Sequence, residues 1–539
     1  MRRSAALVAT LTTALTTALV LAALGAGSAA SATTMPGGPG PSALPGASGA
    51  TTSAPSSAAA RAQAEQALRV AGRLVGAGDA VVPDRTGPDP AGRDATAALL
   101  QLRLTMHALP TADRRQAEAI LSRPTDHPDP VPDGGAYTVK SKRMCAGHIC
   151  VHWVTSTADK APNQAWVDQM LRLMNNVWSY EVGKLGYHRP ISDGRRGGGG
   201  SGKLDVYLKD IGAQGQYGIT VAEKRTSYNK RLYSSYIVID NDFARSQFGT
   251  KPISAARVTA AHEFFHTIQY AYDTREDNWL KEATATWMEE QFADSVNDNR
   301  QYLPYSQLAH PGTPLDTQNG NQQYGNFVFF AYLSQHYGRS IVKSIWKHAA
   351  AFAGGGHEYS AQAIRSALVR HSGMTKVFAS YAAANTQPAH FYTEGAAYPT
   401  SPSAQTVTLT QAARSTPWET HDVRHLASLD VKARPGADLS GRRWMLRVQV
   451  EGPRRSKSPA VAVLVTDKKG QVERHLMQLS RSGTGRVSVS LNADAVSRVT
   501  VTLANASTRF RCGQGSYSCN GAPVVARSRF HLRLTAYRR

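Results

Sequence analysis

The chain has few acidic residues, few cysteines, and no long apolar run after its first two dozen residues. Its 539 residues include 39 Asp and Glu against 61 Lys and Arg, which gives a formal charge of +22. This excess suits anionic partners such as cell-wall polymers or acidic substrates. Nucleic acid is also anionic, but the sequence lacks both an aromatic-rich basic motif and zinc-finger spacing. We therefore expect no nucleic-acid partner.

A run of bilayer length occurs only at the N-terminus. Arg2 and Arg3 precede an apolar run over residues 5–24, and small residues at 30–32 suit signal-peptidase cleavage. An uncleaved membrane anchor is the alternative, although several threonines interrupt the run. Residues 1–32 are therefore predicted to be a signal peptide. We expect a secreted, extracellular protein with no stable membrane insertion after cleavage.

The four cysteines form two close pairs, Cys145 with Cys150 and Cys512 with Cys519. In an exported protein this spacing favours two short disulfide loops, although four cysteines allow three pairings. A second zinc site is the alternative, but no paired histidines accompany the cysteines to support it. The sequence therefore predicts two disulfide bonds.

Two segments lie between the predicted signal peptide and the central part of the chain. Residues 33–60 are rich in Pro, Gly, Ser and Ala and are predicted to be a disordered linker. Residues 61–135 carry apolar stripes at helical spacing and end in a proline-rich stretch. Their position suggests a propeptide, and hence a zymogen that is cleaved between about Pro124 and Tyr137. A permanent helical cap is the alternative.

From residue 401 to residue 539 the chain changes character. Short segments rich in β-branched residues follow one another closely, and several of them alternate apolar and polar residues. This pattern predicts an all-β sandwich of jelly-roll or immunoglobulin-like type. Such a domain would bind substrate or wall polymers; a purely stabilising module is the alternative.

The most informative motif is a His-Glu-Phe-Phe-His run that begins at His262. The apolar stripe of residues 253–272 predicts a helix with Ser254 as its N-cap, so the two histidines lie one turn apart on one face. Histidines at this spacing can hold one tetrahedral metal ion. Glu263 can take a proton from a water on that ion. His262 and His266 are therefore predicted metal ligands, and Glu263 is the predicted general base.

A catalytic zinc ion usually has a third protein ligand. One known form of the H-E-x-x-H motif continues with a glycine and a third histidine. Gln269 and Tyr272 stand at those positions here, so this form is excluded. The pattern of residues 279–290 predicts a second helix. This helix runs antiparallel to the first, which places Glu282 level with the two histidines. Glu289 would overshoot by about 10 Å at a rise of about 1.5 Å per residue. Glu282 is therefore the predicted third ligand; a solvated helix carboxylate is the alternative.

The sequence H-E-F-F-H-T-I-Q-Y-A-Y-D, followed by W-L-K-E-A-T-A-T-W-M-E-E, resembles the gluzincin metallopeptidases. It most resembles little-characterised secreted bacterial families distantly similar to immune inhibitor A, over residues 236–338. The resemblance implies one catalytic Zn²⁺ ion on the two histidines and Glu282, with Glu263 as general base. Thr286 stands where the thermolysin-type pattern has an aspartate, which puts the surroundings of the ligands in doubt. The G-x-M-E-N signature of aminopeptidases is absent, which favours an endopeptidase acting on polypeptides.

The order of predicted elements fits the fold that this resemblance implies. That fold is an α+β zincin-like catalytic domain over residues 136–400, with a twisted sheet above the active-site helix and a helical lower lobe over about residues 279–387. The strand before the motif could bind an extended peptide by edge pairing. In the upper part, strands are predicted over residues 150–154, 204–208 and 235–240, and a helix is predicted over residues 162–184.

Further roles are assigned to single residues. Tyr324 opens an apolar helix and is the predicted donor to the oxyanion of the reaction; His336 and Tyr337 are alternatives. Asp240 and its neighbours offer oxygens that suit a structural Ca²⁺ ion, with a carboxylate-rich turn as the alternative. Candidates for holding a ligand histidine by its second nitrogen are Asp273, Thr286 and Glu289.

The sequence thus predicts a secreted, monomeric, zinc-dependent endopeptidase. Two other functions stay open. One is a binding or adhesion protein on a degenerate peptidase scaffold, which the presence of all three ligands and the base disfavours. The other is a zinc hydrolase that cleaves cell-wall peptides.

Overall fold

The computed structural model describes residues 57–76, 95–126, 135–198, 202–513 and 515–539. Residues 52–539 form one compact unit, and the second unit, residues 1–51, lies outside the described residues. The predicted signal peptide therefore lies outside the described residues, as does most of the predicted linker. Residues 57–60 of that linker are helical rather than disordered, because their alanine-rich sequence continues into the first helix.

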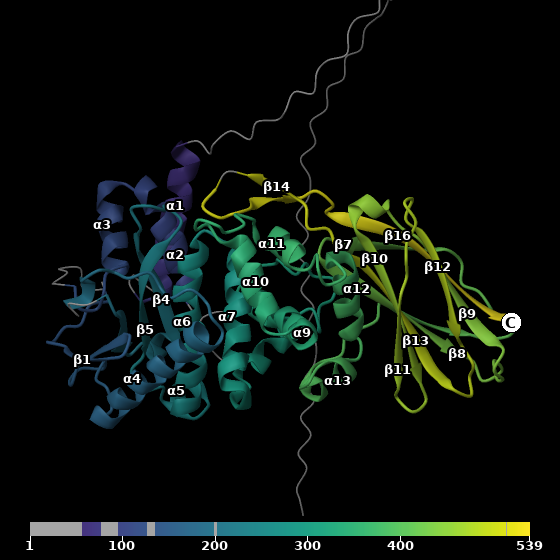
Figure 1. Cartoon of the computed structure of the whole chain (residues 1–539), viewed down its shortest axis with the longest axis horizontal. Coiled ribbons are helices and arrows are strands. Elements are labelled where there is room, and N and C mark those ends of the chain that lie inside the picture. Colours follow the sequence, from purple (N-terminus) through teal and green to yellow (C-terminus); the bar gives the residue numbers. More distant parts are fainter. Residues whose placement is uncertain (1–56, 77–94, 127–134, 199–201, 514) are drawn as a thin grey trace, which may run out of the picture. The chain divides into compact units, whose positions relative to one another are not determined.

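The N-terminal part of the described chain is helical, as predicted. Its helices are α1 (Ser57–Leu74), α2 (Thr96–Thr105) and α3 (Thr111–Ile120). The apolar stripe residues Leu68, Ala71 and Leu99 are buried, and they share one core with sheet residues such as Val221 and Tyr236. The three helices therefore pack against the sheet that follows them in the chain (Figure 1).

Five strands form a mixed sheet in the order β1-β2-β3-β5-β4. Strands β2, β3 and β5 are parallel, whereas β1 and β4 pair antiparallel at the two ends of the sheet. Helix α4 (Gln164–Trp178) connects β2 to β3 and ends in a π-helical turn, Ser179–Lys184, so the predicted helix over 162–184 is not α-helical throughout. The strands are β1 (Lys142–Ala146), β2 (Ile149–Trp153), β3 (Leu204–Lys209), β4 (Gly218–Arg225) and β5 (Tyr233–Asp240).

The predicted strand over 235–240 is present as β5, but it is not an edge strand. Strands β3 and β4 flank it on both sides, so its backbone groups already have partners. An incoming peptide cannot pair with β5 for that reason. The outer edge of the sheet on this side belongs to β4, which the sequence pattern does not predict.

Two long helices below the sheet carry the motif residues. They are α6 (Pro252–Asp273), preceded by the short α5 (Arg245–Phe248), and α7 (Asn278–Ala293). Ser254 lies inside α6 and is not its N-cap; Pro252 is the first helical residue, because its fixed φ suits that position.

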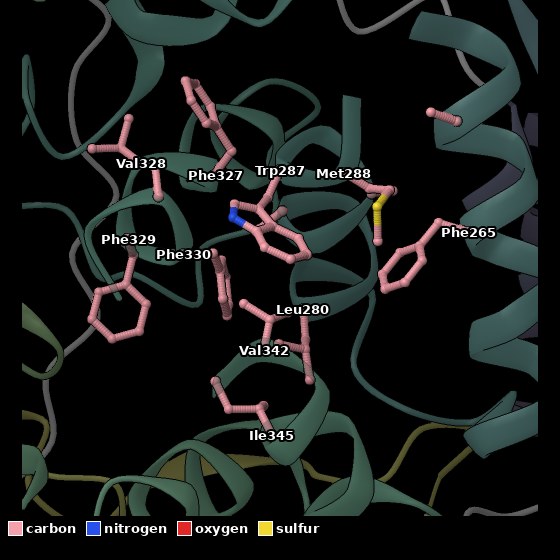
Figure 2. Packing of buried hydrophobic residues seen from close by; sticks show 14 of the residues in the cluster. Phe265, Leu280, Trp287, Met288, Phe327, Val328, Phe329, Phe330, Val342 and Ile345 are labelled. Atoms are coloured by element: carbon pink, nitrogen blue, oxygen red, sulfur yellow. The ribbon is translucent and has the colours of Figure 1, made fainter. Parts of the chain in front are cut away.

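Six further helices follow α7 and account for the predicted helical lower region. Figure 2 shows Phe265 of α6 and Met288 of α7 pointing toward one another, with Trp287, Phe330 and Val342 in the same buried cluster. This packing fixes α7 against both α6 and the helices after it. Among the described residues, no helix has the length and apolar content needed to cross a bilayer. The helices are α8 (Gln322–Gly325), α9 (Phe327–Tyr337), α10 (Ser340–Ala349), α11 (Ser360–Ala367), α12 (Met374–Ala384) and α13 (Pro388–Phe391).

The C-terminal part is rich in β-structure, as predicted. Two sheets, ordered β11-β10-β13-β8-β6 and β12-β9-β16-β7, enclose one apolar core. Alternate residues of β10 face two cores: Val461 and Val463 face the core between the sheets, and Ala462 and Leu464 join the cluster of the helices. The strands are β6 (Gln405–Leu409), β7 (Glu419–Arg424), β8 (Ala427–Pro435), β9 (Trp444–Glu451), β10 (Pro459–Asp467), β11 (Val472–Leu476), β12 (Thr484–Ser490), β13 (Val496–Asn505) and β16 (Arg527–Arg538).

Both predicted disulfides are confirmed. Cys145–Cys150 joins β1 to β2. Cys512–Cys519 closes a small hairpin formed by β14 (Phe510–Gly513) and β15 (Asn520–Pro523), which we call the disulfide hairpin.

Candidate metal centre

Helix α6 is an enclosed support for the motif residues. Every residue from 258 to 273 is buried, because β4 and β5 lie on one side of the helix and α4, α7 and α10 pack around the others. His262 keeps 7% of its surface exposed and Glu263 keeps 2%, whereas His266 is fully buried. A helix packed in this way holds its side chains in fixed positions, as a metal site requires.

The three predicted ligands converge on one point. Nε2 of His262 and Nε2 of His266 each lie 3.4 Å from Oε2 of Glu282. Their ligand atoms all lie within 4.8 Å of one another. Two donors held about 2.05 Å from a tetrahedral ion are about 3.4 Å apart. The spacing of the donors and their types, two imidazoles and one carboxylate, therefore fit a catalytic zinc ion.

In the absence of a metal ion, the surroundings of Glu282 keep its carboxylate charged. Burial raises the pKa of its carboxyl, but the imidazoles of His266 and His262 outweigh burial and hold that pKa below its usual range. Burial likewise lowers the pKa of His266, and the Glu282 carboxylate more than reverses this effect. Neither oxygen of Glu282 accepts a hydrogen bond of good geometry from a described residue. The buried carboxylate of Glu282 thus faces the Nε2 atoms of His262 and His266.

Each ligand histidine is held by its other ring nitrogen. Nδ1 of His262 lies 2.7 Å from Oε1 of Glu289, and Nδ1 of His266 lies 2.8 Å from Oε1 of Gln269. Because both partners present oxygen acceptors, each Nδ1 carries the proton and each Nε2 keeps its lone pair for a metal. These two contacts therefore fix the tautomer that a metal site needs.

One of three predicted supporting residues contacts a ligand histidine. Glu289 does so, whereas the carboxylate of Asp273 binds the guanidinium of Arg231. The hydroxyl of Thr286 forms no hydrogen bond within the described part of the chain. Gln269 was missed, although its position one turn after His266 on the same helix face is a signal for such a contact.

The predicted base, Glu263, lies under strand β4. Its Oε2 accepts hydrogen bonds from the hydroxyls of Thr220 at 2.7 Å and Thr96 at 3.2 Å. A Cβ atom at Gly218 would lie 2.6 Å from Cγ of Glu263, so only glycine lets the strand approach the helix this closely. Gly218 and Thr220 are therefore functional neighbours of the base that the sequence analysis did not single out.

Tyr324 lies near the metal ligands, as its predicted role requires. It lines one pocket together with His262 and Glu263, and its ring centre is 6.2 Å from that of His262. Tyr302, in the 3₁₀ segment Asp298–Tyr305, stacks on Tyr324 with a centroid distance of 5.0 Å and lines the same pocket.

The two alternatives to Tyr324 lie elsewhere. Nδ1 of His336 bonds to the carbonyl oxygen of Tyr332, and the ring of Tyr337 contacts His371. Neither belongs to the described residues that line this pocket. This geometry favours Tyr324 over both alternatives, which lie on the last turn of α9.

The oxygens considered for calcium are engaged by the protein itself. The carboxylate of Asp240 accepts N–H groups of Gly212 and Phe243, each at 2.6 Å. Oδ1 of Asp242 accepts the N–H of Ala244 at 2.8 Å. Burial raises the pKa of Asp240 to about 7. These contacts favour the alternative, a carboxylate-rich turn.

The turn between α6 and α7 is held by the disulfide hairpin. The N–H of Ser518 donates to the carbonyl of Arg275 at 2.7 Å, and the side-chain amide of Asn278 donates to the hydroxyl of Tyr517 at 2.8 Å. Asn278 begins α7 one turn before Glu282. The C-terminal part of the chain therefore fixes the spacing between the helices that carry the ligands.

Replacing Glu289 with glutamine should weaken zinc binding by roughly 10- to 100-fold. Glutamine has the same shape but lacks the charge that makes His262 a better donor. The zinc dissociation constant, measured in competition with a chromophoric chelator, checks this. Glu358→Gln is the matched control, since Glu358 bonds to Ser366 and belongs to no candidate metal group among the described residues. Equal affinity in both variants would remove Glu289 from the metal centre.

Comparison with known protein families gives a match over part of the chain. A family model described as a family of unknown function (DUF6055) matches residues 128–354. This span includes the mixed sheet and helices α4 to α10, and therefore all three candidate ligands. No curated protein matches the chain. Residues 128–354 are thus similar to a family whose description assigns no activity.

Proposed function

We propose that the protein is a secreted zinc-dependent endopeptidase. The observation that carries this proposal is the convergence of His262, His266 and Glu282 at donor distances that suit one tetrahedral ion. A mixed sheet above α6 and a helical region below it also agree with the zincin-like fold that the sequence resemblance implies. The two disulfides agree with an oxidising compartment.

The side chains of the pocket have complementary roles in peptide hydrolysis. When bound, zinc supplies a Lewis acid that polarises the scissile carbonyl and makes a water more acidic. Glu263 accepts the proton of the attacking water and passes it to the leaving amine. The hydroxyl of Tyr324 offers a hydrogen bond to the oxyanion of the tetrahedral intermediate. Glu289 and Gln269 hold the two imidazoles in the required tautomer.

Hydrolysis of unfolded casein tests the proposal. The chain should be assayed intact and after cleavage between residues 124 and 137, with sequencing of the new N-termini. We expect hydrolysis that 1,10-phenanthroline abolishes and stoichiometric zinc restores. No hydrolysis by either form in the presence of zinc would contradict the proposal. Binding to cells or peptidoglycan without cleavage would instead favour the adhesion function, and the formal charge of +22 makes anionic wall polymers the surface to test first.

A further inference from the structure

Helix α2 lies along the outer edge of β4. Thr220 and Ala222 are two residues apart on this strand, so their backbone groups face the same edge. The N–H of Thr220 donates to the hydroxyl of Thr96 at 2.8 Å, and Nε of Arg103 donates to the carbonyl of Ala222 at 2.8 Å. The side chains of Thr96 and Arg103 thus bond to backbone groups of β4. A further strand added to the sheet would pair with these same groups.

The same helix reaches the general base. Thr96, the first residue of α2, uses its hydroxyl twice: it accepts the N–H of Thr220 and donates to Oε2 of Glu263 at 3.2 Å. A hydroxyl has one proton to donate, so this arrangement uses it fully. The contact therefore joins the strand edge, the base and the N-terminal helices at one point.

The N-terminal helices are anchored firmly enough to hold α2 there. Arg123, just after α3, is 1% exposed and forms ion pairs with Asp193, Asp205 and Glu223. A buried arginine shared by three carboxylates is costly to remove, because the buried acids would lose their common counter-charge. The apolar side chains that α1 and α2 share with the sheet add to this anchor.

We propose that α2 is an internal inhibitor that occupies the β4 edge and the general base, and that it competes with an extended polypeptide for the same backbone groups. An extended peptide adds to a sheet edge through main-chain hydrogen bonds. The N–H of Thr220 and the carbonyl of Ala222 cannot serve the peptide while Thr96 and Arg103 hold them. This inference rests on the proposed function, because it identifies the edge beside Glu263 as the place where substrate binds.

Binding of a fluorescein-labelled casein peptide to the full-length chain tests the inhibitor. A chelator in the buffer prevents hydrolysis, so fluorescence anisotropy reports edge binding alone. The double variant Thr96→Val/Arg103→Met should bind the peptide at least about tenfold more tightly than the parent chain, because it lacks both hydrogen bonds to β4. The matched control is Thr105→Val/Arg114→Met, whose side chains bond only to backbone carbonyls of the N-terminal helices.

Hydrogen exchange of the α2 amides shows independently whether the helix has loosened. Faster exchange in the double variant together with the parent's peptide affinity would overturn the proposal. Equally tight binding by the control variant would also overturn it. A separate arm restores zinc and measures hydrolysis. If neither the variants nor the cleaved chain hydrolyse casein, the peptidase proposal fails, whereas the binding arm still decides whether α2 blocks the edge.

Discussion

Replacing Glu263 with glutamine should abolish casein hydrolysis while the chain keeps its zinc. Glutamine matches the shape of glutamate, and its amide oxygen can still accept the hydroxyl of Thr220 that Oε2 accepts at 2.7 Å. It cannot accept the proton of an attacking water. Loss of a general base costs roughly a hundredfold to ten-thousandfold in rate. We therefore expect the turnover number to fall by at least about a hundredfold.

The measurement is the initial rate of casein hydrolysis together with metal content by elemental analysis. Both must come from one preparation whose circular dichroism matches that of the parent chain. Because Glu263 contacts α2, the comparison should also be made in the Thr96→Val/Arg103→Met background, so that internal inhibition does not hide the difference. Full activity of Glu263→Gln would reject this residue as the base, whatever metal the protein contains.

Replacing Glu282 with alanine should remove most of the metal. Its carboxylate is the only anionic member of the ligand group and contributes the oxygen that lies 3.4 Å from both imidazole nitrogens. The expected loss of zinc affinity is more than about a hundredfold, because it should exceed what loss of a supporting residue costs. Zinc per chain after dialysis against a weak chelator measures this. Retention of one zinc ion per chain would move the third ligand elsewhere.

A second variant separates loss of the ligand from loss of packing. Glu282 is 1% exposed, so alanine also leaves a cavity in α7. Glu282→Gln fills the same volume without the charge. Weak zinc binding by both variants would locate the effect in the carboxylate. Normal binding by Glu282→Gln would show that the alanine variant fails through packing alone.

The ligand group could be predicted from the sequence because its geometry is local. His262 and His266 share one helix, and a short turn leads to the helix that carries Glu282. Helical rise and an antiparallel return are enough to bring these three residues together. The same local periodicity located α6, α7 and β5. The same periodicity holds a signal for Gln269, which the sequence analysis missed, since this residue lies on the face of His266.

The surroundings of the base could not be predicted, because they depend on pairing between distant segments. Thr96 meets Glu263 across 167 residues, and no local pattern reports such a contact. Strand β4 was missed because it ends in a charged stretch and does not alternate clearly. The close approach at Gly218 becomes meaningful only when the strand lies on α6. The order of the strands in the sheet, which makes β4 the edge, is likewise a tertiary property.

The disulfide hairpin also bears on when the turn between α6 and α7 is completed. The N–H of Cys519 donates to Oδ1 of Asp277 across 242 residues, so a ribosome translates both ligand helices long before it makes the hairpin that contacts their turn. Disulfides form in oxidising compartments and rarely in the cytosol. The contact between the disulfide hairpin and the turn before α7 is therefore completed only after both ligand helices have been made, and its disulfide needs an oxidising compartment.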